Sequence, residues 1–265
     1  MSQRVRLIRR LARHWPVVSR VVPTRHLPYP VRGGWVYLSL GNAPTSLQRV
    51  LRTYEPQKFA NIARLLPPGG GFVDVGANAG DFSVWAVRCG GPTTRVLAIE
   101  AEPENARWLR RTIGRNHLDA QVRIENVAAS DSAGETELLL TARNGTHSIV
   151  ENELHHQLDA FRPVQRITVP TVTLDALIAA ADLPSVDLVK IDVEGAELLV
   201  LGGATQLLAS GRPLALLIDL HFGVDLRALG RLLQDHGFTL RLEDTPDVVI
   251  DEIAPHTLSI VAVRG

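Results

Sequence analysis

The side chains most able to do chemistry follow an apolar stretch near residue 190. Residues 187–197 read DLVKIDVEGAE, so Lys190, Asp192 and Glu194 come where a buried strand would end. In open α/β sheets, ligands bind outside the carboxyl ends of the strands. Burying an amine with two carboxylates is costly unless they pair or contact a ligand. We therefore expect a catalytic site here, with a structural ion-pair cluster as the alternative, and Glu197 in the first turn of the next helix.

A second set follows the apolar residues 214–218. Alternation along a strand puts Asp219 and His221 on one face, where the strand would meet the same site. A histidine can accept a proton from a hydroxyl near neutral pH, and an adjacent carboxylate raises its basicity. We expect His221 to act as general base, with the residues near 190 orienting the acceptor. The alternative is a divalent metal site made by Asp192, Glu194, Asp219 and His221.

A glycine-containing turn predicts a nucleoside site. Residues 72–80 read FVDVGANAG, and residues 95–100 end a second apolar run on Glu100. A strand, such a turn, a helix and a strand ending on a carboxylate are typical of nucleoside-binding α/β sheets. Gly76 permits the tight turn, and Gly80 lets a ligand approach the main-chain N–H groups of the helix. Glu100 can accept hydrogen bonds from both ribose hydroxyls.

The same turn discriminates between nucleosides. The dinucleotide fingerprint Gly-x-Gly-x-x-Gly has Asn78 and Asp81 in place of its second and third glycines, and an acid here repels a pyrophosphate. A dehydrogenase is therefore disfavoured. S-adenosylmethionine carries positive charge on its sulfonium and ammonium groups, which tolerate Asp74 and Asp81 in the wall of the site. Beyond the third strand, Asn126 and Ser130 are candidates to bind the adenine.

The elements that position these residues alternate between strands and helices. The pattern predicts a seven-stranded, mostly parallel sheet with helices on both faces. The expected strands are 72–76, 95–100, 121–126, 186–191, 213–220, 238–242 and 257–263, and the expected helices are 47–66, 81–89, 103–116, 173–181, 195–209 and 224–236. Two further strands, 135–140 and 166–169, flank the polar segment 141–163. A loop this long in a compact domain is usually functional, so we expect it to cover the acceptor.

Charge divides the chain unevenly. The net charge is zero, but residues 1–54 contain ten arginines and no acid, which leaves a net charge of −10 for residues 55–265. We expect an Arg-rich arm over residues 1–46, mostly irregular with one short strand at 35–38, followed by a single domain over residues 47–265. Apolar residues at helical spacing between residues 5 and 15 are typical of a helix that lies on an anionic membrane. The alternative is a solvated arm, or a helix packed on the domain.

The composition of the chain argues against several other classes of protein. Cys89 is the only cysteine, so one chain can form neither a disulfide framework nor a cysteine-based zinc site. No apolar run reaches the ~20 residues needed to span a bilayer, and no signal peptide follows the first arginines. We expect a cytoplasmic protein, peripheral at the membrane if residues 1–20 bind lipid, with no nucleic-acid partner.

From about residue 72 to residue 221, the chain resembles the FkbM-like family of S-adenosylmethionine-dependent methyltransferases. The resemblance rests on residues 74–80 (DVGANAG), on Glu100 with residues 102–105 (EPEN), on residues 126–130 (NVAAS), and above all on residues 190–197 (KIDVEGAE). It implies a Rossmann-like class I methyltransferase fold and methyl transfer to a hydroxyl of a sugar, glycolipid or secondary metabolite. Family members usually have Glu where this chain has Asp219.

Two functions are therefore compared. The first is O-methylation, in which the cofactor supplies the electrophile and the protein aligns the acceptor oxygen and removes its proton. The second is a noncatalytic module that binds S-adenosylmethionine or a nucleoside and docks through its basic arm. Activity on a hydroxyl acceptor separates the two.

Overall fold

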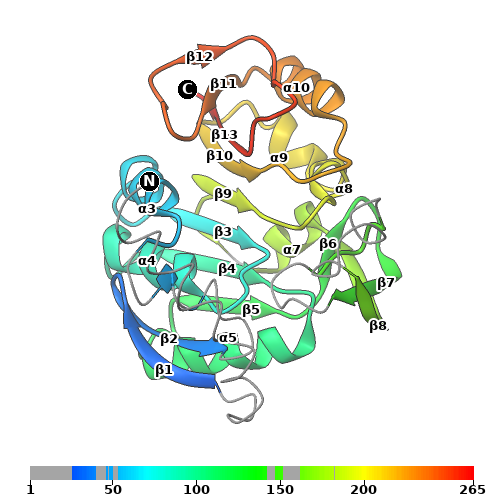
Figure 1. Cartoon of the computed structure of the whole chain (residues 1–265). Coiled ribbons are helices and arrows are strands. Elements are labelled where there is room, and N and C mark those ends of the chain that lie inside the picture. The colour runs from blue at the N-terminus through cyan, green and yellow to red at the C-terminus, as the bar shows by residue number, and fades with distance from the viewer. Residues whose placement is uncertain are drawn as a thin grey trace, which may run out of the picture.

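A computed structural model describes residues 26–39, 46, 48–49, 53–141, 147–151, 162–181 and 183–265. A large twisted sheet runs through the middle of the molecule, with helices packed against it (Figure 1). The expected membrane helix at residues 1–20 and most of the polar segment 141–163 lie outside the described residues. Within the described part of the chain, no helix has both the length and the apolarity to cross a bilayer.

The central sheet has eight strands in the order β12-β11-β13-β10-β9-β3-β4-β5. Neighbouring strands from β5 through β10 run parallel, whereas β13 is antiparallel to both of its neighbours. The seven expected strands are present, and β12 adds one. Their bounds are β3 Gly71–Val75, β4 Arg95–Ile99, β5 Val122–Glu125, β9 Leu188–Ile191, β10 Leu214–Asp219, β11 Thr239–Leu242, β12 Val249–Ile250 and β13 Ser259–Arg264.

Alternation along the strands divides the core between two faces. Phe72 and Val96 pack with α3 (Pro56–Leu65), α4 (Asp81–Gly90) and α5 (Pro103–Arg115). Val73 and Leu97 pack on the other face, with α7 (Leu174–Ala181), α8 (Glu197–Gly202), α9 (Thr205–Ala209) and α10 (Leu226–Asp235). Because both faces are covered, the central strands are apolar throughout, as parallel sheets require. A charged side chain inside such a strand therefore needs an oppositely charged or hydrogen-bonding partner within the buried layer between sheet and helices.

A second, three-stranded sheet with the order β6-β8-β7 lies beside the carboxyl ends of the central strands (Figure 1). It contains β6 (Ala128–Ser130), β7 (Gly134–Thr141) and β8 (Pro163–Thr173), so the two strands expected here are both longer than predicted. β7 and β8 pair antiparallel, and β6 pairs parallel with β8. This sheet forms a side wall next to the expected site.

The N-terminal residues differ from the expectation in two ways. β1 (His26–Val31) pairs antiparallel with β2 (Gly34–Ser39), so a hairpin stands where one short strand was predicted. The helix expected over residues 47–66 is interrupted: residues 46, 48 and 49 are helical, residues 53–55 are not, and α3 begins at Pro56 with proline in its first turn. The hairpin packs on α5, because Asn116 accepts a hydrogen bond from the Trp35 main-chain N–H at 2.9 Å and donates to its carbonyl at 2.7 Å.

Candidate functional site

A pocket opens at the carboxyl ends of the central strands. Its polar wall contains Gly76 and Asn78 from the turn after β3, Glu100 after β4, and Asp192 and Glu194 after β9. The opposite wall is an apolar slot lined by Ala101, Val127, Ala128, Leu138 and Ile149. The slot suits a flat ring, and the polar wall suits a ribose and a positively charged group.

The turn after β3 has the left-handed backbone that glycine favours. Gly76 has φ 75° and Gly80 has φ 91°, and the Gly76 N–H donates to the Ile99 carbonyl at 2.9 Å. A Cβ at Gly76 would lie 1.9 Å from the Asp192 carbonyl oxygen, so the ends of β3 and β9 are nearly in contact. At Gly80 a Cβ would meet Leu109 of α5 at 2.6 Å. Gly80 makes room for a helix.

Glu100 faces the pocket from the end of β4. Its two oxygens accept hydrogen bonds from the main-chain N–H groups of Asn78 at 2.8 Å and Glu102 at 3.0 Å. Burial raises the pKa of Glu100 to about 7, against these two hydrogen bonds, which lower it. Each carboxylate oxygen retains a lone pair for a ribose hydroxyl. Glu100 is thus held in one orientation with free acceptors directed at a ligand.

Asp74 and Asp81 lie beneath the pocket, and our expectation that they form its wall is wrong. Asp74 is fully buried, accepts a hydrogen bond from Ser83 Oγ at 2.6 Å and lies 3.3 Å from Lys190 Nζ. Asp81 is also buried and pairs with the Arg49 guanidinium, with Nη2 at 2.8 Å. Both charges are compensated inside the protein, so neither is available to a cofactor.

Lys190 is buried, and its ammonium group connects the end of β3 with the end of β9. Its Nζ donates to the Gly76 carbonyl at 2.7 Å and the Val75 carbonyl at 3.3 Å, and it lies 3.5 Å from Asp192 Oδ2. Burial opposes the charge, but the carboxylates of Asp74 and Asp192 outweigh it and raise the pKa of Lys190. The ammonium therefore stays protonated and fixes the turn after β3 against the end of β9.

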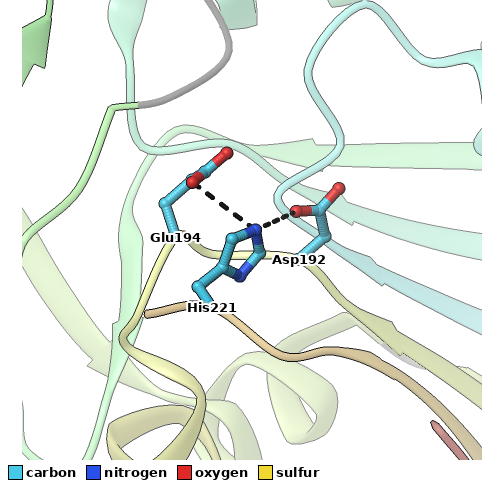
Figure 2. Close-up of side chains that lie close together, drawn as sticks. All are labelled: Asp192, Glu194 and His221. Carbon is cyan, nitrogen blue, oxygen red and sulfur yellow. Dashed lines mark ion pairs between the residues drawn. The ribbon is translucent and has the colours of Figure 1, made fainter. Parts of the chain in front are cut away.

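Asp192 and Glu194 line the pocket, and His221 lies next to both of them. Figure 2 shows both carboxylates directed at the same ring nitrogen, His221 Nε2, which lies 3.6 Å from Asp192 Oδ1 and 3.4 Å from Glu194 Oε2. One ligand atom from each of the three residues lies within 4.8 Å of the others. Figure 2 also shows His221 entering from the chain after β10, across from the β9 turn. The three residues could bind a hydroxyl or hold a cation.

Glu197 completes this group from the first turn of α8. It is fully buried, and its Oε1 lies 2.6 Å from His221 Nδ1. Burial lowers the pKa of His221, but Glu197, Glu194 and Asp192 raise it to about 10. We expected Glu197 to favour the helix dipole alone, and the contact with His221 was missed. One feature of the sequence could have indicated this contact: Glu197 is the third acidic residue within residues 192–197.

Asp219 does not join this group. Its carboxylate pairs with Lys58, a buried residue of α3, on the face of the sheet that carries α3 to α5. Burial and the Asp192 carboxylate raise the pKa of Asp219 to about 7, against the Lys58 ammonium. Among the described residues, the three that could hold one metal ion do not include Asp219. Lys58 was missed, although it is one of only two lysines in the chain.

Asn126 and Ser130 do not line the pocket. The Asn126 amide donates to the carbonyls of Glu100 at 2.7 Å and Ala101 at 3.1 Å. Ser130 is buried, and its Oγ lies 3.4 Å from Asp131 Oδ1. Asn126 therefore shapes the main chain next to the apolar slot, and neither side chain is placed to bind adenine directly.

The described part of the polar segment contacts the site. Ser148 pairs with Leu139 of β7, and its Oγ donates to the Glu194 carbonyl at 2.6 Å. His147 lines the pocket, and its Nδ1 accepts the Thr141 N–H at 3.1 Å. Burial lowers the pKa of His147 to about 4, so the ring is neutral with its proton on Nε2. The segment thus brings a neutral donor to the pocket.

Strand order and site together define a class. The central β3 with its glycine turn, the acidic end of β4, and the antiparallel β13 between β10 and β11 are the arrangement of the Rossmann-like class I methyltransferase fold. The chain belongs to the family of the methyltransferase FkbM domain, which matches residues 74–240.

Several known proteins are similar to this chain. The hexuronic acid methyltransferase AglP of Haloferax volcanii is 29% identical over 164 residues, which are 61% of this chain and 60% of AglP. The match therefore spans about 60% of the length of that relative. The crystal structure of methyltransferase FkbM from Methylobacillus flagellatus KT has a TM-score of 0.48 and 14% identity, and the match covers 84% of this chain and 54% of that one. A precorrin-6y C5,15-methyltransferase from Geobacter metallireducens GS-15 has a TM-score of 0.46 and 15% identity, with 80% and 90% covered.

Proposed function

We propose that this protein transfers a methyl group from S-adenosylmethionine to a hydroxyl of a sugar, glycolipid or secondary metabolite. The observation that carries the proposal is that the Glu100 carboxylate lines the same pocket as the Asp192 and Glu194 carboxylates, which in turn lie 3.6 Å and 3.4 Å from His221 Nε2. Family membership supports methyl transfer. The name of AglP, a hexuronic acid methyltransferase, supports a sugar as the acceptor.

In this proposal Glu100 binds the ribose hydroxyls and the apolar slot takes the adenine. The methionine end then extends toward Asp192 and Glu194, whose negative charge attracts the sulfonium. The acceptor lies between the sulfonium and His221, under the segment that contains His147. Lys190 acts by holding the turn that binds the cofactor.

The reaction is an in-line displacement. The acceptor oxygen forms a bond to the methyl carbon, the carbon–sulfur bond breaks, and its electron pair stays on sulfur, which becomes a neutral thioether. The hydroxyl proton passes to His221 Nε2, and Asp192 and Glu194 orient the hydroxyl. His221 must first lose its own proton, because its pKa is about 10. The bound sulfonium favours that loss, since a nearby positive charge lowers the pKa of an imidazole.

A divalent cation is the alternative at the same place. One imidazole nitrogen and two carboxylates are donors that Mg²⁺, Mn²⁺ and Zn²⁺ accept. Glu197 binds the far nitrogen of His221, as carboxylates do behind metal-bound histidines. Asp192, Glu194 and His221 would hold the ion, which would lower the pKa of the acceptor hydroxyl. Asp219 is left out of this version because its carboxylate pairs with Lys58.

The decisive test incubates the protein with S-adenosylmethionine and a panel of sugars, hexuronic acids included, and looks for the mass of one added methyl group. A positioned base contributes about 10²- to 10⁴-fold, so His221→Ala should lower turnover by that factor with little change in cofactor affinity. EDTA should leave turnover intact if His221 is the base and abolish it if an ion is required. Binding of S-adenosylhomocysteine without transfer to any acceptor would favour the noncatalytic module.

For location and partners, the proposal is a cytoplasmic protein without a nucleic-acid partner, with residues 1–20 in peripheral contact with an anionic membrane. The charge asymmetry of the chain supports this contact, because residues 1–54 hold ten arginines and no acid.

A further inference from the structure

The exposed face of α5 is strongly basic. Its sequence, PENARWLRRTIGR, contains four arginines and one acid. Arg107, Arg110, Arg111 and Arg115 are all exposed, and their spacing of three, four and eight residues places them on one side of the helix. The acid, Glu104, accepts a hydrogen bond from Trp108 Nε1 at 2.7 Å and lies 3.5 Å from Arg107. Most of the positive charge on this face is therefore uncompensated within the helix.

An aromatic side chain of the β1–β2 hairpin lies beside these arginines. Trp35 is 39% exposed. The Arg115 guanidinium lies 4.6 Å from the centre of the Trp35 ring, and that of Arg111 lies 4.5 Å from the Trp108 ring. In Figure 1 the hairpin runs along α5, near the β5 edge of the sheet and far from α10. Aromatic and cationic groups share one surface.

The Arg-rich arm joins the domain at this surface. β1 begins at His26, and its ring stacks on Trp108 at 4.0 Å between centroids. Residues 1–25, immediately before it in the chain, contain seven arginines and no acid, with apolar residues at positions 5, 8, 11, 12 and 15. Arginines interleaved with apolar residues suit a lipid interface better than a nucleic acid, which offers no apolar phase to Trp35 or Val5.

We propose that α5 and the β1–β2 hairpin form a docking surface for an anionic phospholipid membrane, here called the arginine face. Arg107, Arg110, Arg111 and Arg115 would contact lipid phosphates, while Trp35 would enter the headgroup region. The arginine face is separate from the membrane contact proposed above for residues 1–20, and membrane docking through it does not depend on methyl transfer.

The test is co-sedimentation of the full chain with vesicles at low salt. Binding is expected to vesicles with about a third phosphatidylglycerol and not to pure phosphatidylcholine. Arg111→Glu/Arg115→Glu should weaken binding by about 30-fold or more, since each arginine near an anionic surface contributes about fivefold. The matched control is Arg227→Glu/Arg231→Glu, an exposed pair at the same spacing on α10, which should bind as wild type.

Arg110→Glu is a second test variant. Arg110 is exposed on α5, and its substitution removes positive charge without disturbing the contacts that Arg111 and Arg115 make with tryptophan rings. It should weaken vesicle binding while the thermal melt stays unchanged. Equal losses for the α5 and α10 pairs, no binding to anionic vesicles, or binding to single-stranded RNA but not to vesicles would each overturn the proposal. Methylation of a soluble acceptor without vesicles is measured in parallel, so failure of docking is distinguished from failure of the proposed reaction.

Discussion

At the scale of single residues, the acids near the pocket divide by what they contact. Asp74 and Asp81 are buried against a lysine and an arginine, whereas Glu100, Asp192 and Glu194 line the pocket. Removing one of the first two leaves an uncompensated buried charge, which typically costs about 3–5 kcal/mol of stability. Removing one of the other three should mainly change ligand binding or turnover.

Glu100→Gln should weaken binding of S-adenosylhomocysteine by about 10- to 150-fold, because charged hydrogen bonds to the ribose hydroxyls are lost. The affinity of the wild type should also depend on pH. The pKa of Glu100 is about 7, so the carboxylate that we propose to bind the hydroxyls is lost as pH falls through 7. Calorimetry between pH 6 and 8.5 measures both effects, and a wild-type affinity that is flat over this range would remove Glu100 from the ribose site.

The contribution of His221 to the stability of the folded protein should decrease as pH rises. Its pKa is raised to about 10, so its contribution is fully present below the unfolded value of 6.5 and is lost as pH rises through 10. We expect the unfolding free energy to fall by on the order of 1 kcal/mol per pH unit between pH 7 and 9.5. His221→Gln should remove this slope. Urea titrations of both proteins at pH 7, 8 and 9 check it, and parallel curves would contradict it.

At the scale of elements, the ends of the strands could be predicted from the sequence. The side chains that helices bring to those strands could not. Asp192, Glu194 and His221 follow apolar runs whose carboxyl ends meet at one sheet edge, so their proximity could be predicted. The Lys58 to Asp219 pair joins residues 161 apart in sequence, from a helix and a strand. Alternation tells which face Asp219 occupies, but no local pattern tells which helix brings a lysine to it.

The helix expected over residues 195–209 is two helices for a related reason. α8 ends at Gly202 and α9 begins at Thr205. A Cβ at Gly203 would lie 2.0 Å from the Ser130 carbonyl oxygen, so the main chain there touches β6 of the small sheet. Helical periodicity is local and cannot register this contact.

Gly76→Ala should prevent folding, and a folded variant that merely fails to bind is not expected. The new Cβ would overlap the main chain of Asp192, and φ 75° is itself unfavourable for alanine. Gly91→Ala is the control, because Gly91 has φ 94° but no atom within 4 Å of its Cβ. Its cost should be the backbone strain alone, about 1–3 kcal/mol. Circular dichroism and thermal melts compare the two, and equal melting temperatures would contradict the close contact.

At the scale of the whole molecule, the mostly parallel sheet with helices on both faces was predicted from the alternation of apolar strands and amphipathic helices, together with the family resemblance. The hairpin and the packing of residues 26–39 on α5 were not, because Pro28, Pro30, Gly33 and Gly34 read as irregular chain. Tertiary hydrogen bonds from Asn116 to Trp35 stabilise strands that composition disfavours.

Two truncations should therefore differ. Removing residues 1–20 leaves the hairpin and Arg49 in place, so affinity for S-adenosylhomocysteine and thermal stability should match the full chain. Removing residues 1–52 exposes one side of α5 and deprives Asp81 of Arg49, which should cost several kcal/mol. Calorimetry and thermal melts on both proteins test this. A stable, cofactor-binding protein that starts at residue 53 would show that the hairpin is dispensable.

The position of Lys190 also governs when the protein can acquire its shape during synthesis. Lys190 holds the Val75 carbonyl across 115 residues of chain, and β3 has β9 as its second neighbour. Until residue 191 has left the ribosome, β3 has an open edge and Asp74 has no cation. Translation at about 5–20 residues per second makes that wait several seconds long. The nascent N-terminal half is thus a natural client for chaperones, and slow codons before residue 190 would prolong its exposure.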